Sequence, residues 1–208
     1  MKAREEILQR VQAAAVPAVS HPTRRAYAHT VTVPDLLGLF VERVEDYKAT
    51  VIRTHPDGVA AAVAKSLEGA GRVVVPAGFN TSWLPEGIHV VSDQPALSSS
   101  DLDGVDAVVT CAVVGIAVTG TIVLDHTQGQ GRRALTLVPD LHVCVVHADQ
   151  IVGDVPEAVA RLGPSVAAGR PLTWVSGPSA TVDIELIRVH GVHGPRTLRI
   201  VLVEPATA

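Results

Sequence analysis

Side chains capable of chemistry gather near the end of the chain, between residues 176 and 195. Apolar runs typical of β-strands flank this stretch, Leu172–Val175 before it and Leu198–Val203 after it. A ligand site at the edge of an α/β sheet needs such polar groups between two core strands. A polar crossover that only caps a helix and turns the chain is the simpler interpretation, and composition alone favours it. The stretch contains hydroxyls, carboxylates and imidazoles: Ser176, Ser179, Thr181, Asp183, Glu185, His190 and His193.

The local conformation decides what these groups can do, and the sequence leaves two possibilities open. If a helix begins here, Ser179 or Thr181 is its N-cap, and the free N–H groups of its first turn suit an anion. Asp183 and Glu185 would lie in that turn, where the helix dipole favours carboxylates but where they would repel an anionic ligand. The alternation of apolar residues in Val182–Leu186 is instead typical of an extended segment. Only an extended segment would let the two carboxylates share one side.

Two histidines and a carboxylate raise the question of a metal centre. His190 and His193 form a His-x-x-His pattern with Glu185 nearby, and a divalent metal needs three or four such ligands. Gly191 and Gly194 indicate a turn, in which histidine spacing carries little information. Loop histidines with ordinary hydrogen bonds are the preferred interpretation, and we predict no metal.

A second polar turn lies in the middle of the chain, at Thr119-Gly120-Thr121. Glycine at a strand start allows a close approach of the backbone to a ligand, and neighbouring N–H and hydroxyl groups could hold a phosphate or a carboxylate. A bulge or a tight turn between buried strands is the alternative, and the residues alone favour it.

The segment Gly129–Ala134 matches the Gly-x-Gly-x-x-Ala pattern of dinucleotide-binding proteins. That fingerprint needs a full crossover helix, whereas Pro139 leaves about two helical turns at most. We therefore reject a nicotinamide site. The sequence favours a solvated loop that carries Arg132 and Arg133 over the sheet edge, ahead of an anion clamp.

Composition bounds the remaining possibilities. With 208 residues, of which 47% are hydrophobic and 18% charged, the sequence predicts one domain with a large core. A formal net charge of −4, with only 3% aromatic residues, argues against nucleic-acid binding and membrane attachment. Cys111 and Cys144 lie in apolar runs, are expected to be buried, and are too few for an iron–sulfur cluster. The charged segment Met1–Arg10 does not resemble a secretory signal, so we expect a cytoplasmic protein.

Apolar runs alternate with helical segments over most of the chain. This alternation predicts an α/β fold with a mostly parallel sheet covered on both faces. The uncharged run Ala107–Leu124 is long enough to cross a membrane, but its glycines and β-branched residues favour two buried strands joined tightly. We predict a helical extension over residues 1–48, packed on a core domain over residues 49–208. Strand-like segments begin at Thr50, Val73, His89, Ala107, Thr121 and Val143, and helical ones at Ala3, Asp35, Pro56 and Pro156.

Two segments carry a longer motif. The first reads Ser-Gly-Pro-Ser-x-Thr-x-Asp-Ile-Glu over Ser176–Glu185, followed by Gly-Val-His-Gly-Pro over Gly191–Pro195. The second is Gly115–Leu124. In content, order and separation these segments resemble the lactate-utilisation protein C family, the LUD domain, and the resemblance covers residues 49–204. The chain departs from the family pattern at Val118, where an acidic residue is usual.

The resemblance implies a three-layer α/β/α fold similar to that of ribose-phosphate isomerases and CoA transferases. It also implies a component of the system that oxidises L-lactate to pyruvate beside two iron–sulfur partner proteins. Such a component would have no covalently bound cofactor, would bind an unidentified small anionic ligand, and could form a homodimer. The alternative is a stand-alone enzyme that acts on a phosphorylated or CoA-linked small molecule. A non-catalytic assembly module is a third possibility.

The family motifs single out the candidate site residues. His193 matches a family position, and histidine ordinarily titrates near neutral pH, so it is the candidate for proton transfer. Glu185 and Asp183 are further catalytic candidates. A shared site requires the two glycine- and hydroxyl-rich turns to meet at one edge of the core. The ligand-binding candidates are Thr119, Gly120, Thr121, Ser176, Gly177, Pro178, Ser179 and Thr181.

Overall fold

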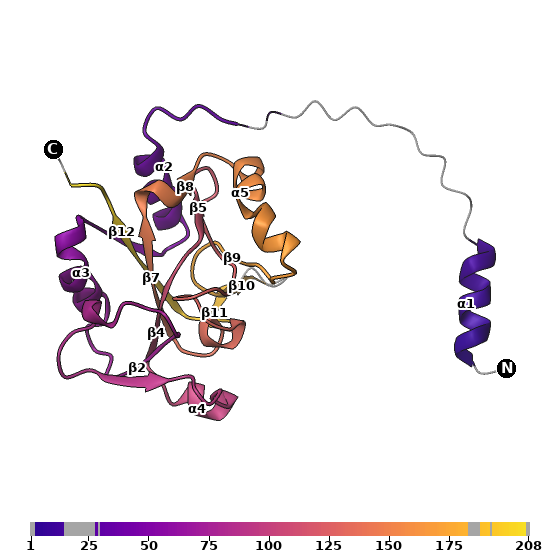
Figure 1. The fold of residues 1–208 in the computed structure, drawn as a ribbon, viewed down its shortest axis with the longest axis horizontal. Helices are drawn as coiled ribbons and strands as arrows, with labels where there is room; N and C mark the ends of the chain where they lie inside the picture. The colour runs from indigo at the N-terminus through magenta and orange to yellow at the C-terminus, as the bar shows by residue number, and fades with distance from the viewer. Residues whose placement is uncertain (1–2, 15–27, 29, 183–187, 192, 207–208) are drawn as a thin grey trace.

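A six-stranded sheet runs through the centre of the molecule (Figure 1). The computed structural model describes residues 3–14, 28, 30–182, 188–191 and 193–206. The strands lie in the order β1, β12, β7, β4, β2, β3, and every neighbouring pair is parallel, as the sequence predicted. The strands are β1 (Thr50–Thr54), β2 (Arg72–Val75), β3 (His89–Ser92), β4 (Ala107–Cys111), β7 (Leu141–His147) and β12 (Thr197–Val203).

One face of this sheet is covered by α3 (Val59–Ser66), which follows the 3-10 turn η1 (Pro56–Gly58). Val59 and Val63 of α3 pack with alternate valines of the central strands, including Val143. The turn η2 (Thr81–Trp83) lies on the same face, since Trp83 packs against the same cluster.

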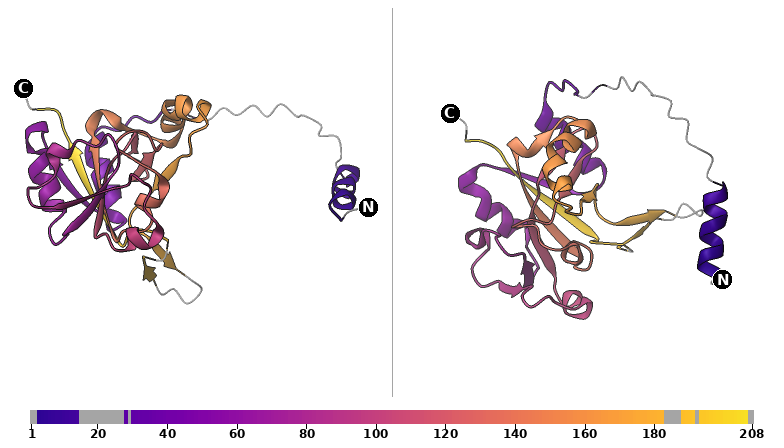
Figure 2. Two further views of the ribbon diagram at one scale, coloured as in Figure 1. Left: turned by 60° about the horizontal axis from the view of Figure 1, so that its bottom comes forward. Right: turned by 45° about the vertical axis from the view of Figure 1, so that its right-hand side comes forward.

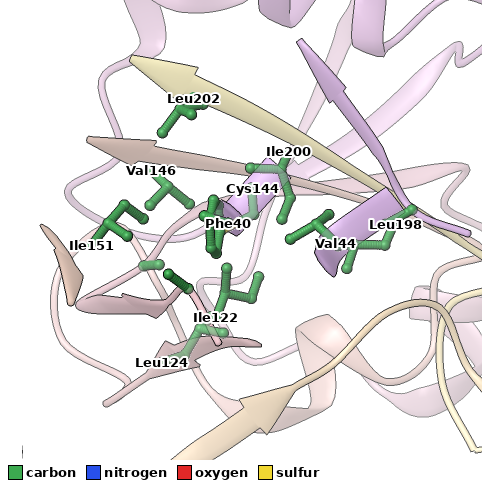
Figure 3. Close-up of a cluster of buried hydrophobic side chains, with 13 residues drawn as sticks. Phe40, Val44, Ile122, Leu124, Cys144, Val146, Ile151, Leu198, Ile200 and Leu202 are labelled. Carbon is green, nitrogen blue, oxygen red and sulfur yellow. The ribbon is translucent and has the colours of Figure 1, made fainter. Parts of the chain in front are cut away.

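The opposite face is covered by α2 (Leu36–Asp46) and α4 (Ser99–Asp103). Phe40 of α2 is fully buried and packs with Cys144 and Ile200 of the sheet (Figure 3). Leu102 of α4 packs on the same face near the other end of the sheet. Helices on both sides of a mostly parallel sheet make the predicted three-layer α/β/α arrangement.

A second, four-stranded sheet lies beside the first, in the order β8, β5, β6, β9. Its inner residues, such as Ile122, share the cluster of Phe40, and α5 (Val155–Ala167) packs on its other side through Leu162. The expectation of two strands over residues 107–124 was wrong, because three strands occupy this run and belong to two sheets. The strands of the second sheet are β5 (Val114–Ile116), β6 (Thr121–Leu124), β8 (Ile151–Val152) and β9 (Thr173–Val175). Two 3-10 turns lie before and after β7 in the chain, η3 (Arg133–Thr136) and η4 (Ala148–Gln150).

A β-hairpin follows the second sheet and projects from the body of the molecule (Figure 2). Its strands are β10 (Ala180–Val182) and β11 (Arg188–His190), paired antiparallel. Of the two possibilities that the sequence left open, the helix beginning at Ser179 or Thr181 is therefore wrong. The extended alternative holds for the residues of β10, while Asp183 and Glu185 lie outside the described residues.

The N-terminal helices differ in burial. α2 packs on the core, whereas α1 (Ala3–Ala14) contributes no buried residue. The division of the chain at residue 48 stays a prediction. Within the part of the chain that the structure describes, the helices are too short or too polar to cross a membrane.

Candidate functional site

The two glycine- and hydroxyl-rich turns meet in the structure. β6 and β9 pair antiparallel with Ile122 opposite Val175, so the start of β6 lies beside the end of β9. The hydroxyl oxygens of Thr121 and Ser176 are 2.7 Å apart, and those of Thr119 and Thr121 are also 2.7 Å apart. The two turns therefore converge, which is the arrangement that a shared site requires. Because Thr121 is only 4% exposed, its hydroxyl serves to join the turns.

Gly120 and Gly177 bring these turns against the end of α2. Gly120 has a φ of 58°, and a Cβ added there would lie 2.6 Å from the backbone carbonyl carbon of Arg43. Gly177 has a φ of 86°, and its added Cβ would lie 2.6 Å from the Cβ of Tyr47. Packing against α2 accounts for both glycines, and their part in ligand binding stays a prediction.

A cavity of about 360 Å³ opens between β9, the start of the hairpin and the segment before β12. We call it the hairpin cavity. Its size suits a small molecule. Five of the site residues predicted from the sequence line it: Ser176, Gly177, Pro178, Ser179 and His193. The complete lining is Arg133, Thr136, Leu137, Thr173, Trp174, Val175, Ser176, Gly177, Pro178, Ser179, Ala180, His193, Gly194 and Pro195.

Ser179 holds the two sides of this cavity together. Its hydroxyl oxygen accepts a hydrogen bond from the backbone N–H of His193 at 3.1 Å. Its own N–H donates to the carbonyl of Pro195 at 2.8 Å, and its carbonyl accepts from Gly191 at 2.9 Å. These bonds leave the His193 side chain exposed at the cavity wall.

The other predicted residues lie elsewhere. Thr119 lines a neighbouring hollow with Arg43, Asp46, Tyr47 and Val118. Thr121 and Gly120 are buried at the junction of the turns. The backbone of Thr181 belongs to β10, whereas Asp183 and Glu185 lie outside the described residues. Of the three predicted catalytic residues, His193 is therefore the one that lies among the described residues.

The hairpin cavity lies at the amino ends of β7 and β12, since its lining residues precede these strands. Open α/β sheets usually bind ligands at the carboxyl ends. Here a loop fills part of that edge: Gly129 accepts from the N–H of Cys111 at 2.7 Å and donates to the carbonyl of Ala77 at 2.8 Å. A 3-10 turn, η3, follows this loop, so the crossover helix of a dinucleotide fingerprint does not follow it.

The adjacent arginines Arg132 and Arg133 have different environments. Arg132 donates two hydrogen bonds to the carboxylate of Asp93, at 2.8 and 2.9 Å, and one to the carbonyl of Leu97 at 2.6 Å. The hydrogen bonds from Arg132 hold the pKa of Asp93 below its usual value. Arg133 is exposed, and its guanidinium makes no hydrogen bond or ion pair with the described residues, although its backbone carbonyl accepts from the hydroxyl of Thr136 at 3.2 Å. The solvated-loop expectation was therefore wrong for Arg132 and fits Arg133.

Comparison with known proteins identifies the family. The sequence model of the LUD domain matches residues 37–203. The chain belongs to the LUD-domain family. The resemblance seen in the two motifs is confirmed, and the match includes almost all of α2 as well as the α/β core.

Curated relatives and a solved structure agree with this assignment. The LUD-domain chain is 52% identical to a lactate utilization protein C of Deinococcus radiodurans over 81% of this chain and 80% of that protein. It is 26% identical to a lactate utilization protein C of Bacillus licheniformis over 89% of this chain and 85% of that protein. The crystal structure of a DUF162 family protein from Deinococcus radiodurans superposes with a TM-score of 0.73 at 47% identity, covering 81% of this chain and 96% of that chain.

Sequence reasoning missed a histidine that adjoins the hairpin cavity of this LUD domain. His126, just after β6, has its Nδ1 2.7 Å from the carbonyl oxygen of Gly131 and its Nε2 2.8 Å from the hydroxyl oxygen of Thr173. Thr173 lines the hairpin cavity, and His126 lines a hollow on the other side of Arg133. No spacing motif joins these residues, which are 47 positions apart.

A buried carboxylate next to His126 was also missed. Asp125 is 2% exposed, and its carboxylate accepts hydrogen bonds from the hydroxyls of Ser165 and Thr127, each at 2.6 Å. The guanidinium of Arg170 lies 3.4 Å from it. Burial alone would raise the pKa of Asp125, but the bonds from Ser165 and Thr127 and the charge of Arg170 lower it. The group is therefore a charged anchor between β6 and α5.

The cysteines do not offer a reactive thiolate. Cys144 is fully buried, and burial raises the pKa of the half-buried Cys111 to about 11. A thiol with a raised pKa is a poor nucleophile at neutral pH. Among the residues that the structure describes, no three His, Cys, Asp or Glu side chains lie close enough together to hold a metal ion.

Proposed function

We propose that this LUD-domain protein takes part in L-lactate utilisation and that the hairpin cavity binds a small carboxylate such as lactate or pyruvate. The relatives named lactate utilization protein C, one of them 52% identical, support the process. The cavity supports the ligand class, because hydroxyls, a histidine and an arginine line about 360 Å³ of space.

The observation that carries the ligand proposal is the guanidinium of Arg133, which has no hydrogen-bond or ion-pair partner among the described residues. Arginine presents a planar fork of N–H donors that matches a carboxylate. The neighbouring Arg132 already donates two hydrogen bonds to the carboxylate of Asp93, so its fork of donors is occupied. Arg133 lines the hairpin cavity with Ser176 and Ser179, whose hydroxyls can bind further oxygens of the ligand.

Replacing Arg133 with glutamine is expected to weaken the binding of L-lactate and pyruvate about tenfold to a hundredfold. A hydrogen bond to a charged group contributes about 1.5–3 kcal/mol, and each 1.4 kcal/mol is tenfold in affinity. Isothermal titration calorimetry measures the change. Lys65→Gln is the matched control, because it removes one exposed positive charge from α3, on the far face of the sheet.

Equal affinities for Arg133→Gln and the unmodified chain would contradict the carboxylate site. The same titrations with a sugar phosphate and a CoA thioester test the alternative activity. Tighter binding of either one, with turnover, would favour a stand-alone enzyme.

We further propose that the protein acts beside iron–sulfur proteins that carry the electrons. Two cysteines cannot supply the four thiolates of a cluster, so electron transfer would need partners. Deleting the gene is expected to abolish growth on L-lactate, and the tagged chain is expected to retain cluster-bearing proteins on purification. Growth on L-lactate at the normal rate, with no cluster absorbance in the purified material, would contradict this role.

A further inference from the structure

The hydrogen bonds of His126 fix which of its ring nitrogens carries a proton. The carbonyl of Gly131 can only accept, so Nδ1, 2.7 Å away, must donate. In the neutral ring Nε2 is then the acceptor, and the hydroxyl of Thr173, 2.8 Å away, donates to it. With its hydrogen committed to His126, the Thr173 oxygen can only accept a hydrogen bond from a molecule in the hairpin cavity.

Protonation of His126 reverses this polarity. Nε2 then carries a hydrogen and donates to the Thr173 oxygen, since both ring nitrogens of the imidazolium are donors. The Thr173 hydroxyl hydrogen becomes free to turn toward the cavity. The same side chain thus accepts from a ligand in one state and donates to a ligand in the other, without any movement of the backbone.

We propose that Thr173 and His126 distinguish a 2-hydroxy acid from a 2-oxo acid bound in the hairpin cavity. The inference rests on the proposed carboxylate site, in which Arg133 holds the carboxylate. A ligand hydroxyl donates to Thr173 when His126 is neutral, and a ligand carbonyl accepts from Thr173 when His126 is protonated. Thr173 is the specificity-determining residue, and His126 is a positioning residue that acts through it.

The charges around His126 determine how the effect of its protonation should be measured. The suitable quantity is the ratio of the affinity for lactate to the affinity for pyruvate. His126 lines its hollow with Arg132 and Arg133, and Asp125, the residue before it in the chain, forms an ion pair with Arg170. Arg132 is paired with Asp93, and Asp125 is paired with Arg170, which leaves Arg133 as the uncompensated charge. A carboxylate at Arg133 changes that charge equally for both ligands. Its effect on His126 therefore cancels when the two affinities are compared at the same pH.

Trp174 gives a direct signal for the experiment, because it lines the hairpin cavity and is 41% exposed. The other tryptophan, Trp83, contacts Phe79 on the far face, so Trp83→Phe leaves Trp174 as the reporter. L-Lactate and pyruvate are each titrated between about pH 5 and pH 8, where histidines change charge. Calorimetry on the unmodified chain measures the same two affinities without relying on fluorescence.

We expect the ratio of lactate affinity to pyruvate affinity to fall about tenfold as the pH falls through this range, because the pyruvate carbonyl gains a donor in Thr173, whereas the lactate hydroxyl can donate or accept and keeps its hydrogen bond in both states. Thr173→Val keeps the β-branched shape but removes the hydroxyl, so it is expected to abolish the pH dependence of the ratio. Thr173→Ser is expected to retain it. His126→Asn, a change that tolerates the positive φ of 61°, is expected to make the ratio constant.

A ratio that does not change with pH, while both ligands bind and Arg133→Gln weakens both, would overturn this inference and leave the carboxylate site standing. A pH-dependent ratio that survives in Thr173→Val would also overturn it. Failure of both ligands to bind the unmodified chain at any pH would overturn the carboxylate site itself, and this inference with it.

Discussion

Replacing Gly120 with alanine is expected to lower the free energy of unfolding by about 2–5 kcal/mol. Two costs add at this position. Its φ of 58° strains any residue with a Cβ, and that Cβ would lie 2.6–2.8 Å from backbone atoms of Arg43 and Val44. Backbone in the last turn of α2 cannot move aside as a flexible side chain can. Chemical denaturation measures the loss.

Gly69→Ala is the matched control for this prediction. Gly69 also has a positive φ, 89°, but no atom lies within 4 Å of the position its Cβ would take. It is expected to lose about 1 kcal/mol, from backbone strain alone. The difference between the two variants isolates the contact with α2. If Gly120→Ala loses no more than Gly69→Ala, the close packing of the turn on α2 is wrong.

This contact changes how binding data on the candidate residues should be interpreted. A Gly120 variant would lose ligand binding simply because the turn that carries Thr119 and Thr121 moves away from Ser176. The guanidinium of Arg133 makes no hydrogen bond or ion pair with the described residues, so its replacement is expected to leave the fold intact. Arg133 is therefore the informative position for testing the ligand, although Gly120 lies in the clearer sequence motif.

The parallel core was predictable from the sequence because its signal is local. Runs such as Val73–Val75 and Val143–Val146 are apolar at every position, which is typical of strands buried on both faces. The same property hid the second sheet. Strands β5 and β6 are also buried at every position, and apart from Thr121 they carry no polar side chain, so no alternation marks the sheet to which each strand belongs.

The site was harder to predict than the core, because its geometry depends on pairing between distant segments. The antiparallel register of β6 and β9 brings Thr121 to Ser176 and His126 to Thr173. No spacing rule in a single sequence gives that register. The hairpin shows a related difficulty, since Ser179 is a good helix N-cap by residue type but here joins the hairpin to the segment before β12.

Replacing Asp125 with alanine is expected to cost about 3–5 kcal/mol of stability, the usual penalty for removing one partner of a buried charged group. The change would leave the hydroxyl of Ser165 and the guanidinium of Arg170 without their acceptor. Asp125→Asn keeps the shape and one acceptor oxygen, so a smaller loss is expected. Thermal and chemical unfolding at neutral pH measure both. Losses below about 1 kcal/mol for alanine would contradict the role of Asp125 as an anchor.

The ionisation of Asp125 also predicts a pH dependence. Folding lowers the pKa of this carboxyl below its usual value of 3.8, because the bonds from Ser165 and Thr127 and the charge of Arg170 outweigh the opposing effect of burial. Its stabilisation is therefore complete at neutral pH and is lost as the pH falls through the folded-state pKa. The stability difference between the unmodified chain and Asp125→Asn should shrink as the pH drops below 3.8.

Asp140→Asn is the control, since its partner Arg196 and Asp140 itself are both more than 60% exposed. That variant should change stability by less than about 1 kcal/mol at any pH, and an equal acid response in both variants would contradict the assignment.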